Sequence, residues 1–156
     1  MKTIFVLLVS LFFVTYRALA VENVSQLSAA PLEFGTITVH IKELKNSEGM
    51  LAVSLHNSKK GFPGKYEEAY SNQLKKITNT EETIIFEHIP YGTYAVSIMH
   101  DENSNGKMDK YFIGIPKEGF GISNNPKIGI GGPKYSNSEF TLNTSLLDLT
   151  IVMKYL

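Results

Sequence analysis

The segment His-Asp-Glu-Asn-Ser-Asn-Gly-Lys-Met-Asp, residues 100–109, holds the side chains best suited to chemistry. Oxygen-bearing side chains recur at every second position, a glycine follows them, and an acid closes the segment. In cation-binding loops, positions 1, 3 and 5 direct oxygens at one point, position 6 permits the turn, position 7 offers its carbonyl, and position 9 reaches the ion. Here these positions are Asp101, Asn103, Asn105, Gly106, Lys107 and Asp109.

The pattern favours Ca²⁺ over Mg²⁺, which seldom uses a loop built entirely from protein ligands. Ca²⁺ takes six to eight oxygens, and this loop supplies about five. Phe112 stands where an EF-hand has its bidentate glutamate. Glu118 is a candidate for that missing carboxylate, and the alternative is a plain surface glutamate. The alternative for the whole segment is a metal-free turn, since Asp, Asn and Gly also suit left-handed backbone angles.

The strand that leads into this loop is predicted over residues 93–99, where Tyr94, Val96 and Ile98 enter the core. By the same alternation His100 points inward at the end of the strand. Three roles are open for it: a hydrogen-bonded histidine at the end of the core, a group that orients the loop, or a catalytic base.

Alternating apolar residues predict five further strands, over residues 35–42, 51–56, 83–89, 140–142 and 147–155. The first two are predicted to form a hairpin, with His40 and His56 on exposed polar faces. Helical spacing between Tyr66 and Ile77 predicts a short amphipathic helix. Residues 111–133, rich in glycine and proline, are predicted to form a long surface loop. Together these elements predict an all-β fold over residues 34–156, a single antiparallel β-sandwich of about seven strands, immunoglobulin-like or transthyretin-like.

Residues 1–20 read as a secretory signal peptide, with a basic start, an apolar run and an Ala-Leu-Ala cleavage site. Residues 21–33 are predicted to be a flexible leader. No later run is long and apolar enough for a transmembrane helix. We therefore expect a periplasmic or secreted protein.

Composition excludes several classes of function. Removing Lys2 and Arg17 with the signal leaves 13 of 15 basic residues, against 15 acidic ones, and no arginine. Arginine is the usual clamp for phosphate, so nucleic acids and phosphorylated substrates are poor candidates. The absence of cysteine excludes disulfides and thiolate metal sites.

Three segments resemble the signature of a bacterial family of exported domains of unknown function. They are Tyr-Ala-Val at 94–96, the segment 100–109, and Gly-Ile-Pro-Lys-Glu-Gly-Phe-Gly-Ile-Ser-Asn-Asn at 114–125. The resemblance covers about residues 35–155 and implies a small single-domain protein without an assigned activity. Residues 101–109 are also similar to the calcium loops in B-type repeats of staphylococcal surface adhesins, which implies calcium.

Three functions compete. The first, which we favour, is a non-enzymatic module that binds a protein or glycan of the cell envelope. Its contacts would include Tyr111, Phe112 and Phe120, unless these aromatic side chains are buried under the long loop.

The second function is a hydrolase with His100 as base, Asp101 or Glu118 as its partner, and Ser123 as nucleophile, an assignment that only geometry can decide. The third is a copper or zinc carrier using His100 with Met99 or Met108. Neighbouring strand residues face opposite ways, which weakens the third hypothesis.

Overall fold

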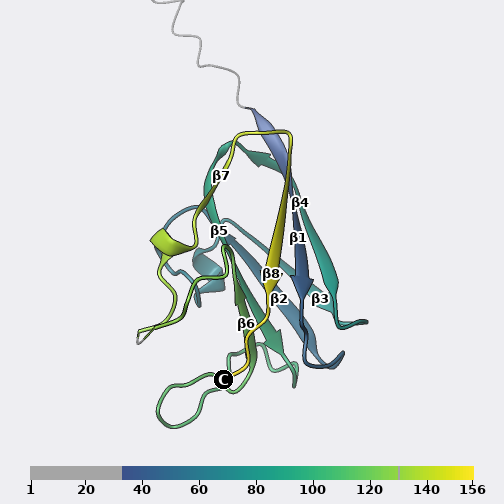
Figure 1. Ribbon diagram of the computed structural model, residues 1–156, viewed down its shortest axis with the longest axis vertical. Helices are drawn as coiled ribbons and strands as arrows, with labels where there is room; N and C mark the ends of the chain where they lie inside the picture. The colour runs from purple at the N-terminus through teal and green to yellow at the C-terminus, as the bar shows by residue number, and fades with distance from the viewer. Residues whose placement is uncertain (1–32, 130) are drawn as a thin grey trace, which may run out of the picture. The chain divides into compact units, whose positions relative to one another are not determined.

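The computed structural model describes residues 33–129 and 131–156. The predicted signal peptide and all of the predicted leader except Glu33 lie outside these residues. Regular structure in the described part consists of strands and two short 3-10 helices (Figure 1). In chain order they are β1 (Phe34–Lys42), β2 (Met50–His56), η1 (Tyr66–Glu68), β3 (Ser71–Lys76), β4 (Glu82–Pro90), β5 (Gly92–Asp101), β6 (Gly119–Ile122), η2 (Tyr135–Asn137), β7 (Phe140–Leu142) and β8 (Leu146–Val152).

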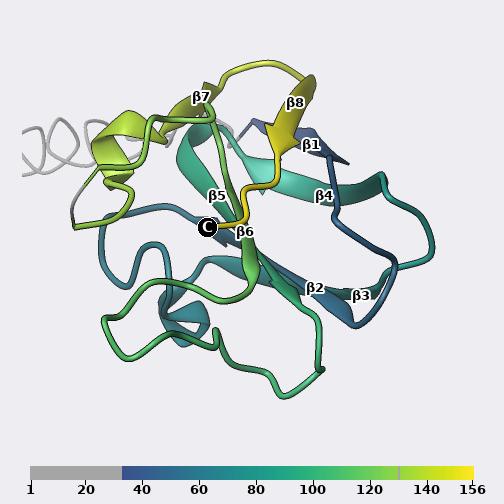
Figure 2. The ribbon, with the colours of Figure 1, turned by 60° about the horizontal axis from the view of Figure 1, so that its bottom comes forward.

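The strands form two sheets. One has the order β4-β1-β8, and the other has the order β3-β2-β5-β6, with β7 pairing with the start of β5. Strands β1 and β8 run parallel, and the other pairs are antiparallel. The all-β, sandwich-like class predicted from the alternation is confirmed. Figure 2 shows the two sheets from their lower end.

The core contains the apolar residues that alternate along the strands. On β1, Ile37, Val39 and Ile41 are completely buried, and inward residues of β2, β4 and β5 pack against them. β-Branched residues suit these positions because they pack well on a pleated surface. The alternation therefore identified the inward faces of β1, β2 and β5.

The predicted hairpin between the first two strands is wrong. Strand β1 pairs with β4 and β8, whereas β2 pairs with β3 and β5. Residues 43–49 therefore connect the two sheets instead of closing a hairpin within one. Alternation assigns a strand's buried face, but it does not identify the strand that will hydrogen-bond to its edge.

The predicted helix over residues 66–77 is also wrong. A single 3-10 turn, η1, is followed by strand β3, which pairs with β2 from Met50↔Lys76 to Leu55↔Ser71. The apolar side chains at helical spacing do not form one buried face, since Tyr66 and Leu74 are exposed whereas Ile77 is buried. Pairing with β2 outweighs the weak local signal.

The predicted long surface loop contains strand β6. Its four residues pair with β5 from His100↔Gly119 to Ser97↔Ile122 and are buried. Glycine is required at position 119 because a Cβ there would lie 2.2 Å from the Tyr155 ring. Alternating glycines therefore mark a strand that another part of the chain approaches closely.

All strand pairings of the described residues lie within Glu33–Leu156, which forms one compact unit. We expect this compact unit to fold on its own. Within the described residues no helix has the length and apolar character needed to cross a membrane.

Candidate functional site

The loop that joins β5 to β6, residues 102–118, projects from the end of the sheets where the C-terminus lies (Figure 1). Asp101, the last residue of β5, is buried and closes the first turn of this loop. Its Oδ1 accepts a hydrogen bond from the Asn105 backbone N–H (3.0 Å), and its Oδ2 accepts one from that of Gly106 (2.7 Å). Gly106 has φ of +75°, the left-handed conformation that glycine adopts without strain.

The remaining predicted ligands of the loop lie in one hydrogen-bonded cluster. Asp109 Oδ2 accepts from the side-chain amides of Asn103 (2.8 Å) and Asn105 (3.2 Å). The amide oxygens of these two residues accept from the backbone N–H groups of Asn105 and Lys107, respectively. The structure therefore brings together the oxygen-bearing side chains at positions 101, 103, 105 and 109.

Glu118 is a buried residue that ties the two ends of the loop together. Its Oε1 accepts from the Glu102 N–H (3.1 Å), and its Oε2 accepts from the Asp109 N–H (2.9 Å). The alternative of a plain surface glutamate is wrong, because the residue is 4% exposed. Its role as a cation ligand stays a prediction.

A cation in this loop would depend on amide and carbonyl oxygens as well as on carboxylates. Within residues 33–129 and 131–156, no three side chains of His, Cys, Asp or Glu are grouped to hold a metal. The loop offers the carboxylates of Asp101 and Asp109, two asparagine amides, and the carbonyl of Lys107. Asp109 Oδ2 already accepts two amide N–H groups, whereas its Oδ1 accepts no hydrogen bond from the described residues. A set of carboxylate, amide and carbonyl oxygens suits a hard cation and not a soft one.

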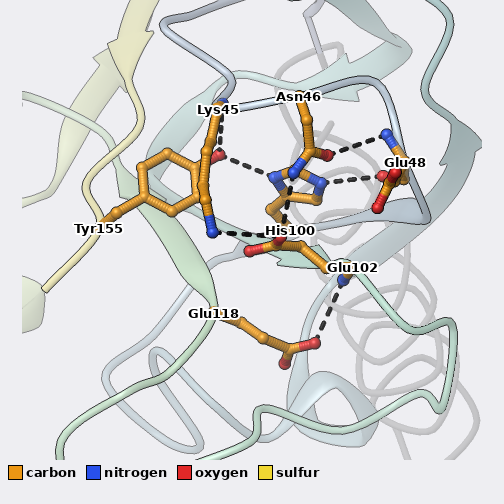
Figure 3. Close-up of polar contacts among 7 residues, drawn as sticks. All are labelled: Lys45, Asn46, Glu48, His100, Glu102, Glu118 and Tyr155. Carbon is orange, nitrogen blue, oxygen red and sulfur yellow. Dashed lines mark hydrogen bonds and ion pairs between the residues drawn. The ribbon is translucent and has the colours of Figure 1, made fainter.

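His100 lies completely buried beside the loop and has both ring nitrogens hydrogen-bonded (Figure 3). Its Nε2 lies 2.9 Å from the Glu48 carbonyl oxygen, and its Nδ1 lies 2.7 Å from the Tyr155 hydroxyl. A carbonyl only accepts, so Nε2 carries the proton in this contact, and Nδ1 is placed to accept from the Tyr155 hydroxyl. The same hydroxyl accepts from the Lys45 N–H (3.0 Å). Of the three roles left open, this geometry supports the hydrogen-bonded histidine.

Glu102 connects the 43–49 segment to the start of the loop (Figure 3). Its carboxylate accepts from the Asn46 side-chain amide (3.0 Å) and pairs with the Lys45 ammonium (3.4 Å). Burial acts to raise the pKa of Glu102, but the Asn46 hydrogen bond and the Lys45 charge hold it below its ordinary value. The carboxylate is therefore ionised at neutral pH and anchors the loop to the neighbouring turn.

The residues proposed for a hydrolase are not hydrogen-bonded to one another. Ser123 is completely buried, where its hydroxyl donates to the Ser138 carbonyl (2.6 Å) and accepts from the Val96 N–H (2.9 Å). His100 contacts Tyr155 and Glu48 instead, and Glu118 contacts backbone N–H groups. In this structure each of these groups is therefore hydrogen-bonded to a structural partner and not to another hydrolase candidate.

Two of the residues proposed for a copper or zinc site, Met99 and His100, lie on opposite sides of the sheet. Met99 lines a cavity on the outer face of the larger sheet, whereas His100 is buried with both nitrogens engaged. This arrangement agrees with the alternation of side chains along β5.

The two strand histidines differ in environment. His40 is partly exposed and lies 3.3 Å from Asp148, as expected for a polar face. The predicted exposure of His56 is wrong: it is 1% exposed, its Nε2 lies 3.1 Å from the Ser97 hydroxyl, and the Phe62 ring packs against it. The segment after β2 folds back over this face. Burial lowers the pKa of His56, which favours the neutral form of the ring.

A cavity of about 270 Å³ on the outer face of the larger sheet was not predicted. Its lining includes Met50, Ala52, Leu74 and Met99, and it reaches Asp101 and Gly106 of the loop. It could not be found from the sequence because it depends on the β2–β3 pairing, in a region where a helix was predicted.

The aromatic residues proposed as contacts separate into two groups. Phe120 lies on β6 and is buried, so for this residue the alternative of burial is confirmed. Tyr111 and Phe112 project into solvent, with Phe112 completely exposed and Tyr111 53% exposed. Together with Ile113 and Ile115 they form an exposed turn, residues 111–115, which we term the apolar tip.

The described residues thus define an all-β, sandwich-like domain whose main irregular feature is a hydrogen-bonded polar loop with an apolar tip. Residues 39–149 match the model of a family described as uncharacterized protein conserved in bacteria (DUF2141), and the chain belongs to this family. No curated protein and no solved structure matches the chain.

Proposed function

We propose that this protein is an exported, non-enzymatic binding module of the bacterial cell envelope, with a calcium-type cation in the loop of residues 101–109. The observation that carries the proposal is the cluster of Asp101, Asn103, Asn105 and Asp109 around a turn at Gly106. These side chains share one small region, and their oxygens are those that Ca²⁺ prefers.

Two further features favour binding over catalysis. The hydrolase candidates His100 and Ser123 are buried and use their polar atoms in structural hydrogen bonds. The apolar tip, in contrast, presents large side chains to solvent at the end of the same loop. Exposed apolar groups gathered on one projection are typical of contact surfaces. Export is supported by the signal-like residues 1–20.

The expected affinity is modest. The loop supplies two carboxylates without the bidentate glutamate of an EF-hand, so we expect a dissociation constant of about 10⁻⁴–10⁻³ M, as in extracellular calcium modules. Glu118 adds negative charge beside the site, although its oxygens already accept two backbone N–H groups. A bound Ca²⁺ would balance the negative charges of the Asp101 and Asp109 carboxylates.

The test is calorimetric titration of Ca²⁺ into chelator-treated protein, residues 33–156. Asp109→Asn is the sharpest variant, because the Asp109 carboxylate accepts only from the two asparagine amides among the described contacts. Asp101→Ala removes a proposed ligand and also the two hydrogen bonds that Asp101 accepts from the Asn105 and Gly106 N–H groups. Asp148→Asn, an exposed acid on β8, is the matched control. We expect saturable binding that both loop variants abolish and the control retains. Absence of binding at millimolar Ca²⁺ would refute the cation site.

A further inference from the structure

The apolar tip is a short, closed turn at the end of the β5–β6 loop. Lys110 and Pro116 form an isolated bridge at its base, and the Lys117 N–H donates to the Asp109 carbonyl (2.8 Å). Within the turn, the Tyr111 N–H donates to Ile115 O, and the Gly114 N–H donates to Tyr111 O, each at 2.8 Å. Some of the backbone polar groups are therefore paired internally, which favours entry into a medium of low polarity.

The side chains of the tip are apolar and strongly exposed. Phe112 is completely exposed and Ile113 is 76% exposed, while Tyr111 and Ile115 are exposed to a lesser degree. Residues 111–116 contain no charged side chain. Such exposure is unfavourable in water unless the side chains are covered by something else in the functional state.

Lysines flank this apolar turn. Lys107 and Lys110 precede it and Lys117 follows it, and all three are exposed. In the part of the chain that the structure describes, none of them forms an ion pair. The Lys117 ammonium lies 5.3 Å from the centre of the Tyr111 ring, which places a positive charge at the level of an aromatic side chain. The tip therefore combines an apolar end with a cationic rim.

The single acid in residues 107–117 is Asp109, which is engaged by the amides of Asn103 and Asn105. This stretch carries three positive charges against one negative charge, and the other acids of the loop, Glu102 and Glu118, lie at its base, where Glu118 is buried. The local excess of positive charge matches a negatively charged surface.

We propose that the apolar tip inserts into the interface of a lipid bilayer with anionic headgroups, which the flanking lysines bind. This inference rests on the proposed function, because it takes the tip as the contact surface of the binding module. Aromatic side chains favour the headgroup level, and lysines keep their ammonium groups among the headgroups while their stems follow the apolar side chains.

A bilayer fits these features better than a protein or a glycan. A stable protein interface buries about 800 Å² on each partner and involves roughly 20–30 residues, whereas the tip presents four large side chains on a narrow projection. Protein interfaces are also depleted in lysine, which here surrounds the apolar group. A neutral glycan would not explain the cationic rim.

The test is flotation of residues 33–156 with protein-free vesicles of phosphatidylcholine, with and without phosphatidylglycerol, in Ca²⁺ and in chelator. We expect binding to the vesicles that contain phosphatidylglycerol. The double variant Phe112→Ser/Ile113→Ser should lower the partition coefficient about tenfold or more. Leu146→Ser removes an apolar side chain about as exposed as Ile113, at the start of β8, and should leave binding unchanged.

The contribution of charge is tested with Lys110→Gln and Lys117→Gln. Each should lower partition into anionic vesicles by about fivefold, since a lysine near such a surface contributes about that factor. Lys59→Gln, which removes an exposed lysine after β2, is the control. All substituted side chains are exposed, so the variants should keep the fold, and circular dichroism checks this.

Absence of vesicle binding, or binding that the tip variant retains, would overturn the lipid proposal. Binding to purified peptidoglycan that depends on the tip, without vesicle binding, would also overturn it while leaving the proposed binding function in place. Calcium titration without lipid reports separately on the 101–109 loop, so failure of one proposal is distinguishable from failure of the other.

Discussion

Replacement of Tyr155 by Phe tests the hydrogen bonds that hold the base of the loop. The Tyr155 hydroxyl donates to His100 Nδ1 (2.7 Å) and accepts from the Lys45 N–H (3.0 Å). Tyr155→Phe keeps the ring, which packs edge-on against His100 with centroids 5.9 Å apart. The substitution therefore removes two hydrogen bonds and little else.

The expected loss of stability comes mainly from His100. This residue is completely buried, so its Nδ1 would lose its partner without gaining access to water. An unpaired buried polar group costs about 1–3 kcal/mol. The Lys45 N–H lies nearer the surface, where water can replace the hydroxyl. Together these effects predict a decrease of about 2 kcal/mol in the free energy of unfolding.

The measurement is urea unfolding of residues 33–156, followed by circular dichroism. A decrease of about 2 kcal/mol corresponds to a midpoint lower by about 1 M in urea. Tyr111→Phe is the matched control, since Tyr111 is an exposed tyrosine of the tip and its substitution should change stability by less than about 0.5 kcal/mol. If Tyr155→Phe is no more destabilising than this control, His100 is not held as described.

Two further predictions concern pH. Burial acts to raise the pKa of Glu82, but hydrogen bonds from Lys75, Thr78 and Asn79 outweigh it and lower the pKa from 4.5 to about 2. The native state should therefore lose about 3 kcal/mol as pH falls from about 5 to about 2, and Glu82→Gln should remove most of this loss in acid-unfolding curves; identical pH profiles would contradict the assignment. Burial lowers the pKa of His56 below 6.5, so the folded protein favours the neutral ring. As the pH falls below 6.5, the unfolded chain binds a proton at this histidine more readily than the folded protein does, and the free energy of unfolding should decrease. His56→Leu should flatten this part of the profile in urea unfolding, and an unchanged slope would show that another group is responsible.

The sequence predicted those parts of the fold that depend on local alternation. The inward faces of β1, β2 and β5 follow from apolar residues at every second position, and His100 is buried at the end of the same series. The turn at 101–106 was predictable because Asp, Asn and Gly satisfy its backbone through their own side chains.

Pairing between distant segments was not predictable in this way. The partners of β1 are β4 and β8, which no local pattern identifies, so the predicted hairpin failed. The burial of His56 depends on a later segment that covers an otherwise polar face. Strand β6 was missed because Gly119 accommodates the Tyr155 ring and Gly121 accommodates Ile151 and Met153, which are contacts between residues far apart in sequence. Within the candidate site, the two hydrogen bonds that Glu118 accepts, from the Glu102 and Asp109 N–H groups, also depend on how the loop folds and not on a local pattern.

The loop has a firmly anchored base and an exposed end, and this contrast bears on its function. Asp101, Glu102 and Glu118 each make at least two polar contacts that fix the base of the loop. His100, at the end of β5, is hydrogen-bonded to the Glu48 carbonyl beside this base. These contacts account for the stability of the base, but they do not explain Phe112, which contributes no buried surface to the fold. A protein gains solubility by placing polar residues at such a position. The exposed aromatic side chain is therefore better explained by contact with another surface than by folding.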